Sequence, residues 1–436
     1  MKKISRATAV IIATCLATLP SIAFAADEIS GADTAWIMTS TALVLMMTLP
    51  GLALFYGGLV RVKNVLSIFM QCFAIAGVVS ILWVLFVYSL AFGDGGSANA
   101  WIGGFGKAFF AGIGRDTPFG TLPESVFSMF QLTFAIITPA LIVGGFAERM
   151  RFSAMLAFSI IWLIVVYAPI THWVWGGGWL QQMGLLDFAG GTVVHITAGV
   201  SALVAALVLG RRSGFPKTPM PPHNLTLTVA GAGMLWVGWF GFNGGSALAA
   251  NSDAGMAIFV THLSASAGAT MWMLMEWLKF GKPSTLGIVT GMVAGLGTIT
   301  PASGFVGPMG GIVIGLLAGF ICFNATQIIK QKLHIDDSLD VFPVHGIGGM
   351  LGTFLAGIFV SSQLGVFSGA GLAEGMTMAK QVGVQITGIL ATGIWAGVIT
   401  WLTLKMLDAV MGIRVTAEDE SQGLDIAEHE ERGYII

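Results

Sequence analysis

Long runs of apolar residues, separated by short polar or Gly- and Pro-rich segments, dominate the pattern of this chain. After the first 25 residues, eleven runs approach or exceed the roughly 20 residues that a helix needs to cross a membrane. They cover residues 33-60, 65-93, 123-147, 152-175, 189-210, 225-243, 254-279, 285-301, 308-329, 338-360 and 382-406. The pattern predicts an all-α polytopic membrane protein with eleven transmembrane helices, which we number spans 1 to 11.

The first 25 residues have the pattern of a secretory signal peptide. Lys2, Lys3 and Arg6 form a basic start, an apolar stretch follows, and Ala23-Phe24-Ala25 has the small-x-small pattern of a cleavage site. The apolar stretch is short for a membrane span, and an uncleaved first helix is the alternative. We expect a signal peptide at 1-25, a transmembrane domain at 26-406 and a tail at 407-436.

The distribution of Lys and Arg predicts the orientation in the membrane. An odd number of spans places the two termini on opposite sides, and signal cleavage would leave the new N-terminus outside. In that orientation 14 of the 20 Lys and Arg residues lie on the inner side, three lie on the outer side and three belong to the signal peptide. This bias agrees with the positive-inside rule and predicts a cytoplasmic tail.

The composition narrows the class of protein further. Hydrophobic residues make up 55% of the chain and charged residues 10%, whereas a soluble globular protein has roughly 25% charged residues. The net charge of -2 excludes the basic field that nucleic-acid binding requires. The 3 cysteines have neither the spacing of a zinc site nor that of a disulfide framework. We expect no metal and no cofactor.

An internal repeat relates the first five spans to the next five. Asp187 precedes His195 by eight residues at the start of span 5, and Asp337 precedes His345 by eight at the start of span 10. Because each half has an odd number of spans, the halves must be inverted relative to each other. We expect an inverted 5+5 repeat, with span 11 outside it as a stabilising helix.

The inverted repeat predicts a pair of histidines near the middle of the membrane. His195 lies about 10 Å into its helix from the outer side, at about 1.5 Å per residue, and His345 lies at a similar depth from the inner side. His262 has no such mate, so we expect it to be packed or locally bonded. No carboxylate is expected at mid-depth, which favours a neutral, hydrogen-bonding solute over an ion-coupled carrier. A neutral imidazole pair offers both a donor and an acceptor.

Aromatic residues gather near the predicted outer ends of spans 3 and 4. Phe127, Phe130 and Phe134 follow one helix face, and Trp175 ends span 4. An interfacial aromatic belt and lipid-facing packing are the alternatives. Together with the hydroxyl of Ser246, these rings could form a mouth that attracts a small cation.

Four blocks resemble the signature motifs of the ammonium transporters, the Amt/Rh/methylammonium permease family. They are residues 187-195 (DFAGGTVVH), 134-142 (FAIITPALI), 242-246 (FNGGS) and 342-346 (FPVHG). The tail from Arg414 to Tyr434 is also similar to that of the bacterial Amt branch. The resemblance covers essentially the whole chain after the signal peptide.

The resemblance implies transport of ammonium or methylammonium, not an enzymatic activity, with a role for each matching residue. Recruitment is implied for Phe130, Trp175 and Ser246, gating for Phe134 and Phe242, ammonia conduction or proton transfer for His195 and His345, and support of the recruitment site for Asp187. It also implies a homotrimer in the cytoplasmic (inner) membrane that binds a PII-type regulatory protein at its cytoplasmic face.

Several alternatives remain at this point. A membrane metalloenzyme would need a third ligand at mid-depth, which this chain does not offer. An ammonium sensor that signals through its tail remains as the other alternative. The acidic tail is typical of a solvated, partly disordered segment.

Gly307, Gly311, Gly315 and Gly319 form a stripe of small residues on span 9, which suits close helix packing within the subunit or between subunits. We favour packing within the subunit.

Overall fold

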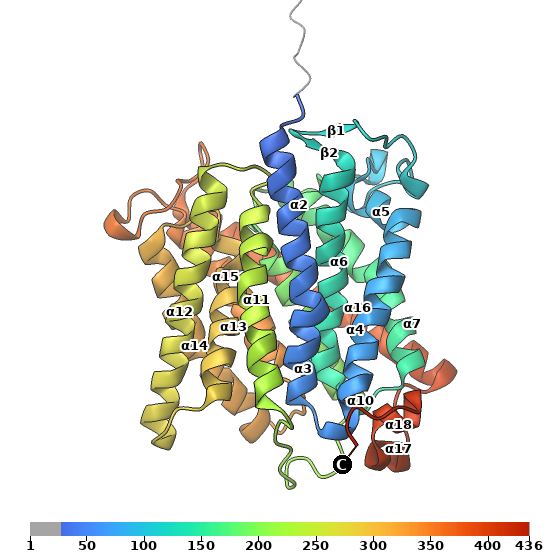
Figure 1. The fold of residues 1–436 in the computed structure, drawn as a ribbon. Coiled ribbons are helices and arrows are strands. Elements are labelled where there is room, and N and C mark those ends of the chain that lie inside the picture. The colour runs from blue at the N-terminus through green and yellow to red at the C-terminus, as the bar shows by residue number, and fades with distance from the viewer. Residues whose placement is uncertain (1–27, 436) are drawn as a thin grey trace, which may run out of the picture.

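The computed structural model describes residues 28–435, so the predicted signal peptide lies outside the described residues. The described chain forms a bundle of eleven helical spans, and its two ends lie at opposite ends of the bundle (Figure 1). The prediction of an all-α protein with eleven spans is confirmed. Span 4 continues beyond the predicted residue 175 to Gln182, and span 11 is longer than predicted at both ends.

Several spans combine α-helical segments with short π or 3-10 turns. Span 1 comprises α2 (Gly31–Met46), η1 (Met47–Leu52) and α3 (Ala53–Leu59); span 2 η2 (Val62–Asn64), α4 (Val65–Leu82), η3 (Trp83–Val87) and α5 (Tyr88–Phe92); span 3 α6 (Glu124–Phe146); span 4 α7 (Phe152–Trp162), η6 (Leu163–Tyr167), α8 (Ala168–Trp175) and α9 (Trp179–Gln182); and span 5 η7 (Gly191–Ile196) and α10 (Thr197–Leu209). Span 6 is α11 (Leu225–Gly245); span 7 α12 (Ser252–Phe280); span 8 α13 (Thr285–Ile299) and η8 (Thr300–Ala302); span 9 α14 (Pro308–Gln327) and η9 (Ile328–Lys332); span 10 η10 (Phe342–Gly346) and α15 (Ile347–Phe359); and span 11 α16 (Met378–Met411).

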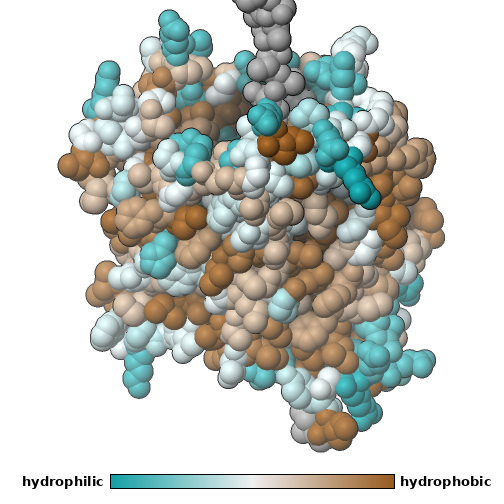
Figure 2. All heavy atoms as spheres, turned by 45° about the horizontal axis from the view of Figure 1, so that its top comes forward, coloured by the Kyte–Doolittle hydropathy of each residue, from teal (hydrophilic) through white to brown (hydrophobic). Residues whose placement is uncertain are grey.

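The remaining α-helices and the two strands lie at the two ends of the bundle. A two-residue hairpin of β1 (Pro118–Phe119) and β2 (Leu122–Pro123) pairs Phe119 with Leu122, and the tail forms α17 (Ala417–Gln422) and α18 (Leu424–His429). Following the predicted orientation, we call the end with the hairpin the outer end and the end with α17 and α18 the inner end (Figure 1). Viewed obliquely from the outer end, the flank is mainly apolar (Figure 2).

The inverted repeat brings equivalent parts of spans 5 and 10 together. The first turns of the two spans, η7 and η10, are π turns that contain His195 and His345. The helices cross closely because glycines face each other, and a Cβ atom added to Gly199 would lie 2.2 Å from the backbone nitrogen of Gly346. This close crossing lets the two histidines approach each other from opposite ends of the bundle.

The glycine stripe of span 9 packs within the subunit, as predicted. A Cβ atom added to Gly315 would lie 2.3 Å from the carbonyl oxygen of Ser264 on α12. Gly311 lies against Val260 and Gly319 against Gly268 of the same helix. The small residues therefore serve the contact between spans 7 and 9.

Buried ion pairs connect four of the loops at the inner end. Arg212 lies 2.9 Å from Glu148 and 2.7 Å from Asp336, and Arg61 lies 2.8 Å from Glu148. Burial acts to raise the pKa of Glu148, but Arg212 and Arg61 outweigh it and hold this pKa below its ordinary value. The network fixes the loops that join spans 1 and 2, 3 and 4, 5 and 6, and 9 and 10.

The expectation of a solvated, partly disordered tail is wrong for the residues described, which pack against the inner end. Leu424 is buried, and its N–H donates to the side-chain oxygen of Asn64 at 2.9 Å. The Asp425 carboxylate accepts from the N–H of Ser67 at 2.8 Å, in the first turn of α4. Helix starts carry unpaired N–H groups, so an acidic tail can dock there with little apolar surface.

Candidate functional site

A cavity of about 300 Å³ lies where spans 3, 4 and 6 reach the outer end. Aromatic rings make up much of its wall, and neither a carboxylate nor a basic side chain is among its described lining residues. These are Phe92, Phe119, Phe127, Gln131, Trp175, Gln181, Phe188, Ser246 and Leu248. Ring faces attract cations, so this lining suits a small monovalent cation better than an anion.

Two oxygen atoms of this outer cavity can accept hydrogen bonds from a ligand. The Ser246 hydroxyl donates to the carbonyl oxygen of Phe242 at 2.8 Å, which leaves its lone pairs available. The Gln131 side chain is buried, and its Oε1 atom has no hydrogen-bond partner among the described residues. A buried acceptor without a partner is costly, so a donor that enters the cavity would stabilise it.

Asp187 supports both the outer cavity and the start of span 5. Its carbonyl oxygen accepts from the Trp175 indole N–H at 2.9 Å. Its carboxylate accepts from the N–H groups of Gly190, Gly191 and Thr192 at 2.8, 2.6 and 2.7 Å. The carboxylate thereby satisfies N–H groups at the start of η7, the turn that carries His195. This single residue ties the orientation of a ring in the outer cavity to the position of a histidine below it.

Buried aromatic rings close the route below the outer cavity. The rings of Phe134 and Phe242 lie 4.3 Å apart between centroids, and Trp175 meets Phe134 edge-on at 5.8 Å. Phe130 is completely buried and packs edge-on against Phe134 at 5.0 Å. Phe130 does not line the outer cavity, whereas Phe127, one turn nearer the outer end, does. An ion could pass only if these rings moved.

A small apolar chamber of about 10 Å³ lies beneath the rings. This volume is about the minimum that one water molecule occupies. Ten of its twelve lining residues are Met47, Leu52, Phe55, Ile137, Leu141, Val194, Leu235, Trp239, Phe242 and Val293, and the other two are His195 and His345. Because no charged side chain is among them, transfer of a bare cation from water into this chamber would be strongly unfavourable.

The two histidines contact each other through their Nδ1 atoms, 3.2 Å apart. Their rings are 17° from parallel, with centroids 5.3 Å apart. One Nδ1 must therefore carry a hydrogen and the other must accept it. The Nε2 atom of His195 is buried and has no partner among the described residues, so it is free to bond a solute in the chamber.

His262 lies away from this route. Its side chain is exposed on the flank of the bundle, with its ring 5.3 Å from that of Trp236 and 6.1 Å from that of Phe240. His262 lies on the outward face of α12 and packs locally against these two rings, in agreement with the expectation that it would be packed or locally bonded. It still serves as a comparison for the paired histidines.

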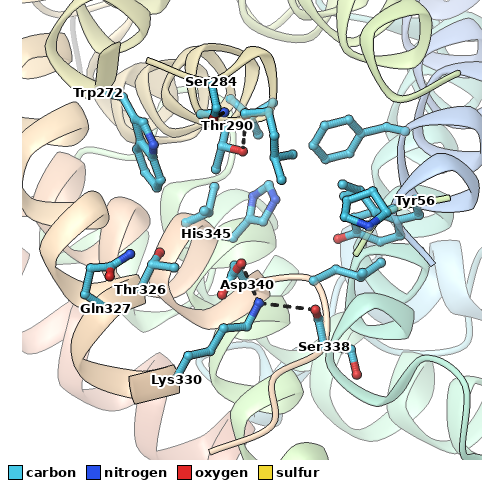
Figure 3. Close-up of a pocket in the computed structure, with 18 of the residues that line it drawn as sticks. Tyr56, Trp272, Ser284, Thr290, Thr326, Gln327, Lys330, Ser338, Asp340 and His345 are labelled. Atoms are coloured by element: carbon cyan, nitrogen blue, oxygen red, sulfur yellow. Dashed lines mark hydrogen bonds and ion pairs between the residues drawn. The ribbon is translucent and has the colours of Figure 1, made fainter. Parts of the chain in front are cut away.

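An inner cavity of about 280 Å³ continues from His345 toward the inner end (Figure 3). Phe55, Val293 and His345 line both the chamber and this inner cavity, so the two spaces are neighbours. Toward the inner end the wall becomes polar, and Lys330 pairs with Asp340 at 2.7 Å. The route thus runs from an aromatic mouth through an apolar constriction to a polar exit.

Asp337 is the repeat equivalent of Asp187, but its environment differs. Its Oδ2 atom accepts from the N–H of Phe342 at 2.7 Å, while Oδ1 has no partner among the described residues. Burial, together with the charge of Asp340, raises the pKa of Asp337 to about 7. Asp187 and Asp337 therefore occupy equivalent positions in the repeat, but fewer hydrogen bonds stabilise the negative charge of Asp337.

Comparison with known proteins identifies the family to which this chain belongs. The sequence model described as Ammonium Transporter Family matches residues 35–434. The chain belongs to the ammonium transporter family. An ammonium transporter of Bacillus subtilis is 47% identical over 92% of this chain and 98% of the relative, and one of Aquifex aeolicus is 45% identical over 96% and 97%.

Solved structures of the family share the fold. The structure of Saccharomyces cerevisiae Mep2 matches with a TM-score of 0.81 and 35% identity, over 90% of this chain and 89% of that one. A structure titled Sensor Amt Protein matches with a TM-score of 0.84 and 29% identity, over 91% and 98%. An ammonium transporter fold is therefore established for this chain.

Sequence reasoning missed several residues of the route in this family member. Trp239 lies nearly parallel to His195, with ring centroids 5.5 Å apart, and its position three residues before Phe242 on one helix face was a usable signal. Gln131 could have been found in the same way, because it follows Phe127 by four residues on one helix face. Phe119 and Leu248 lie in a hairpin and a turn, where no helical periodicity points to them.

Among residues 28–435, no three His, Cys, Asp or Glu side chains come together in a geometry that would hold a metal ion. The side chains that could act on a substrate in the described route are the paired imidazoles, the oxygens of Ser246 and Gln131, and the aromatic rings.

Proposed function

We propose that the protein recruits ammonium in the outer cavity and conducts it inward as ammonia. The observation that best supports this proposal is the order of three environments along one route. A cation-attracting cavity precedes two closed rings, and the rings precede an apolar chamber whose polar atoms come from a histidine pair.

Recruitment depends on the outer cavity. The face of Trp175 attracts the charge of ammonium, at about 0.5–2 kcal/mol for such a ring, and Ser246 accepts one of its N–H bonds. Gln131 offers a second acceptor. Phe130 acts from behind Phe134 by fixing the position of that ring. Asp187 keeps Trp175 in place through its carbonyl oxygen.

Selectivity arises at the rings of Phe134 and Phe242 and in the chamber below them. Ammonium can lose a proton and enter as a neutral molecule, whereas potassium has no proton to lose and would have to enter the chamber as a cation. His195 and His345 then bond the ammonia in turn, one as donor and one as acceptor. The proton either returns to the outside or crosses along the imidazole pair, and these two routes differ in the charge moved per molecule.

The assembly and orientation belong to the same proposal. We infer a homotrimer in the cytoplasmic membrane, with a cleaved signal peptide at residues 1-25, the N-terminus outside and the tail inside. On α12, polar residues follow one another at intervals of four: His262 and Thr270 are exposed, and Ser266 between them is half-buried. Such a polar stripe suits contact with a second copy better than contact with lipid. A PII-type regulator would bind at the inner end, where the polar inner cavity opens beside the docked tail.

Uptake of labelled methylammonium into proteoliposomes tests the function. We expect uptake that excess ammonium inhibits and that equal potassium does not, with empty liposomes as the control. The Sensor Amt Protein match makes a sensor the second candidate. A sensor without transport would give no uptake, yet ammonium would still raise the thermal stability of the purified protein through binding.

A further inference from the structure

Gln385 on span 11 is completely buried, and every hydrogen-bonding group of its amide is used. Its Oε1 atom accepts from the N–H of Leu186 at 2.9 Å and from the side-chain amide of Gln381 at 3.1 Å. Its Nε2 atom donates to the carbonyl oxygens of Leu186 at 2.8 Å and Thr353 at 2.8 Å. One side chain thus joins span 11, the segment before span 5, and α15.

The contact with Leu186 resembles the pairing of neighbouring β-strands, since one amide bonds both the N–H and the carbonyl of the same residue. Adjacent contacts support it. Gln381 donates to the carbonyl oxygen of Gly184 at 2.9 Å, and the Leu185 side chain packs so closely on Gly388 that an added Cβ atom would lie 2.5 Å from it. Three consecutive residues are therefore held against α16.

The next residue is Asp187. Its carbonyl oxygen orients the Trp175 indole, and its carboxylate caps the turn that carries His195. Thr353, the third partner of Gln385, lies on the same helical span as His345. Gln385 therefore holds Leu186, the residue directly before Asp187, and Asp187 links the outer cavity to the histidine pair.

We propose that Gln385 is a positioning residue for ammonium recruitment, which gives span 11 a role in the transport site and not only in packing. The inference rests on the proposed function. Gln385 touches no solute, and it acts through the backbone of Leu186 and Asp187 on the angle of the Trp175 ring.

The test replaces Gln385 with Met, which has a similar length but no hydrogen-bonding amide. Loss of four buried hydrogen bonds should loosen the segment before span 5. We expect the KM for methylammonium to rise by about fivefold or more, and the maximal rate at equal incorporation to change by less than about twofold. The dissociation constant of ammonium, from its effect on thermal stability, should rise in parallel.

Thr400→Val is the matched control. Thr400 is also buried on α16, and its hydroxyl donates to Ser201 at 2.8 Å, far along the helix from Gln385. This variant loses one buried hydrogen bond and should keep the KM of the parent. If Gln385→Met does not fold, Gln381→Met removes the bond to Gly184 and should raise the KM in the same direction by a smaller factor.

A double-mutant cycle with Trp175→Leu separates positioning from general stability. If Gln385 acts through Trp175, adding Gln385→Met to Trp175→Leu should raise the KM little further. An unchanged KM and unchanged ammonium binding in a folded Gln385→Met protein would overturn the proposal, as would fully additive effects in the cycle. Absence of transport by the parent protein would instead contradict the proposed function, and ammonium binding would still test Gln385.

Discussion

At the residue scale, Trp175 and Ser246 contribute different interactions to the outer cavity, a ring face and an oxygen lone pair. We predict that Trp175→Leu raises the KM for methylammonium by about 2- to 30-fold, which corresponds to about 0.5–2 kcal/mol of lost cation–π interaction. Trp179→Leu is the control, because Trp179 packs on Trp101 and Trp173 and does not line the cavity. Equal effects of the two substitutions in proteoliposome uptake would rule out a specific role for the Trp175 ring.

The buried carboxyl of Asp337 makes a pH-dependent contribution to stability. Its pKa in the folded protein, about 7, lies above the ordinary value of 3.8, so the folded state holds this proton more tightly than the unfolded state. Stability from this group is complete below about pH 4 and is lost as the pH rises toward and through 7. We predict that Asp337→Asn raises the melting temperature at pH 8 more than at pH 5.5, relative to the parent. A difference that is the same at both pH values would contradict this assignment.

The site residues were predicted from two kinds of sequence signal, the spacing within a repeat and the periodicity of a helix face. The equal spacing of Asp187 and His195, and of Asp337 and His345, reflects the symmetry of the fold, so the sequence alone could pair the histidines. The aromatic stripe on span 3 could not tell which ring faces the cavity, because Phe127 and Phe130 differ by one turn and small rotations of the helix exchange them. The role of Gln385 carries no sequence signal, since three of its four hydrogen bonds join it to backbone atoms of Leu186 and Thr353, which are distant in sequence.

At the element scale, the inner ion network joins loops that are far apart in sequence. We predict that Glu148→Gln lowers the melting temperature substantially, since removal of one partner from a buried ion pair costs about 3–5 kcal/mol. The parent's advantage should persist at neutral pH and decrease as the pH falls through the lowered pKa of Glu148. Glu418→Gln in the exposed part of the tail is the control. Similar melting temperatures for the two variants would show that the network does not stabilise the inner loops.

Hydropathy predicts the spans of this chain but not their internal geometry. A run of apolar residues reports burial in a membrane, and it does so regardless of whether a turn is α or π. The break in span 1 at Leu49 and Pro50 follows from the missing proline N–H, whereas the π turns at both histidines carry no comparable signal. The order of the tail depends on contacts with Asn64 and Ser67, more than 350 residues earlier in the chain.

At the scale of the whole molecule, the polar stripe of α12 predicts an assembly. We expect light scattering in mild detergent, with the detergent mass subtracted, to give three times the mass of one chain. A monomeric mass would contradict the proposed homotrimer, and it would leave His262 exposed to lipid without an explanation.

A regulator at the inner end is also a property of the whole molecule. We predict that the cognate PII-type protein binds the purified, detergent-solubilised transporter in a nucleotide-dependent way, and that deletion of residues 412-436 weakens this binding. Absence of binding with and without nucleotide would count against the proposed partner.

The most direct test of the account measures flux and current together for His195→Ala, His345→Ala and His262→Ala at equal incorporation in proteoliposomes. We predict that both variants of the paired histidines lose most ammonium transport or lose discrimination against potassium, because the chamber then admits water and with it a hydrated cation. His262→Ala should transport as the parent does. If both variants of the pair carry ammonium at an unchanged rate and with unchanged exclusion of potassium, the histidine pair is packing and the proposed route is wrong.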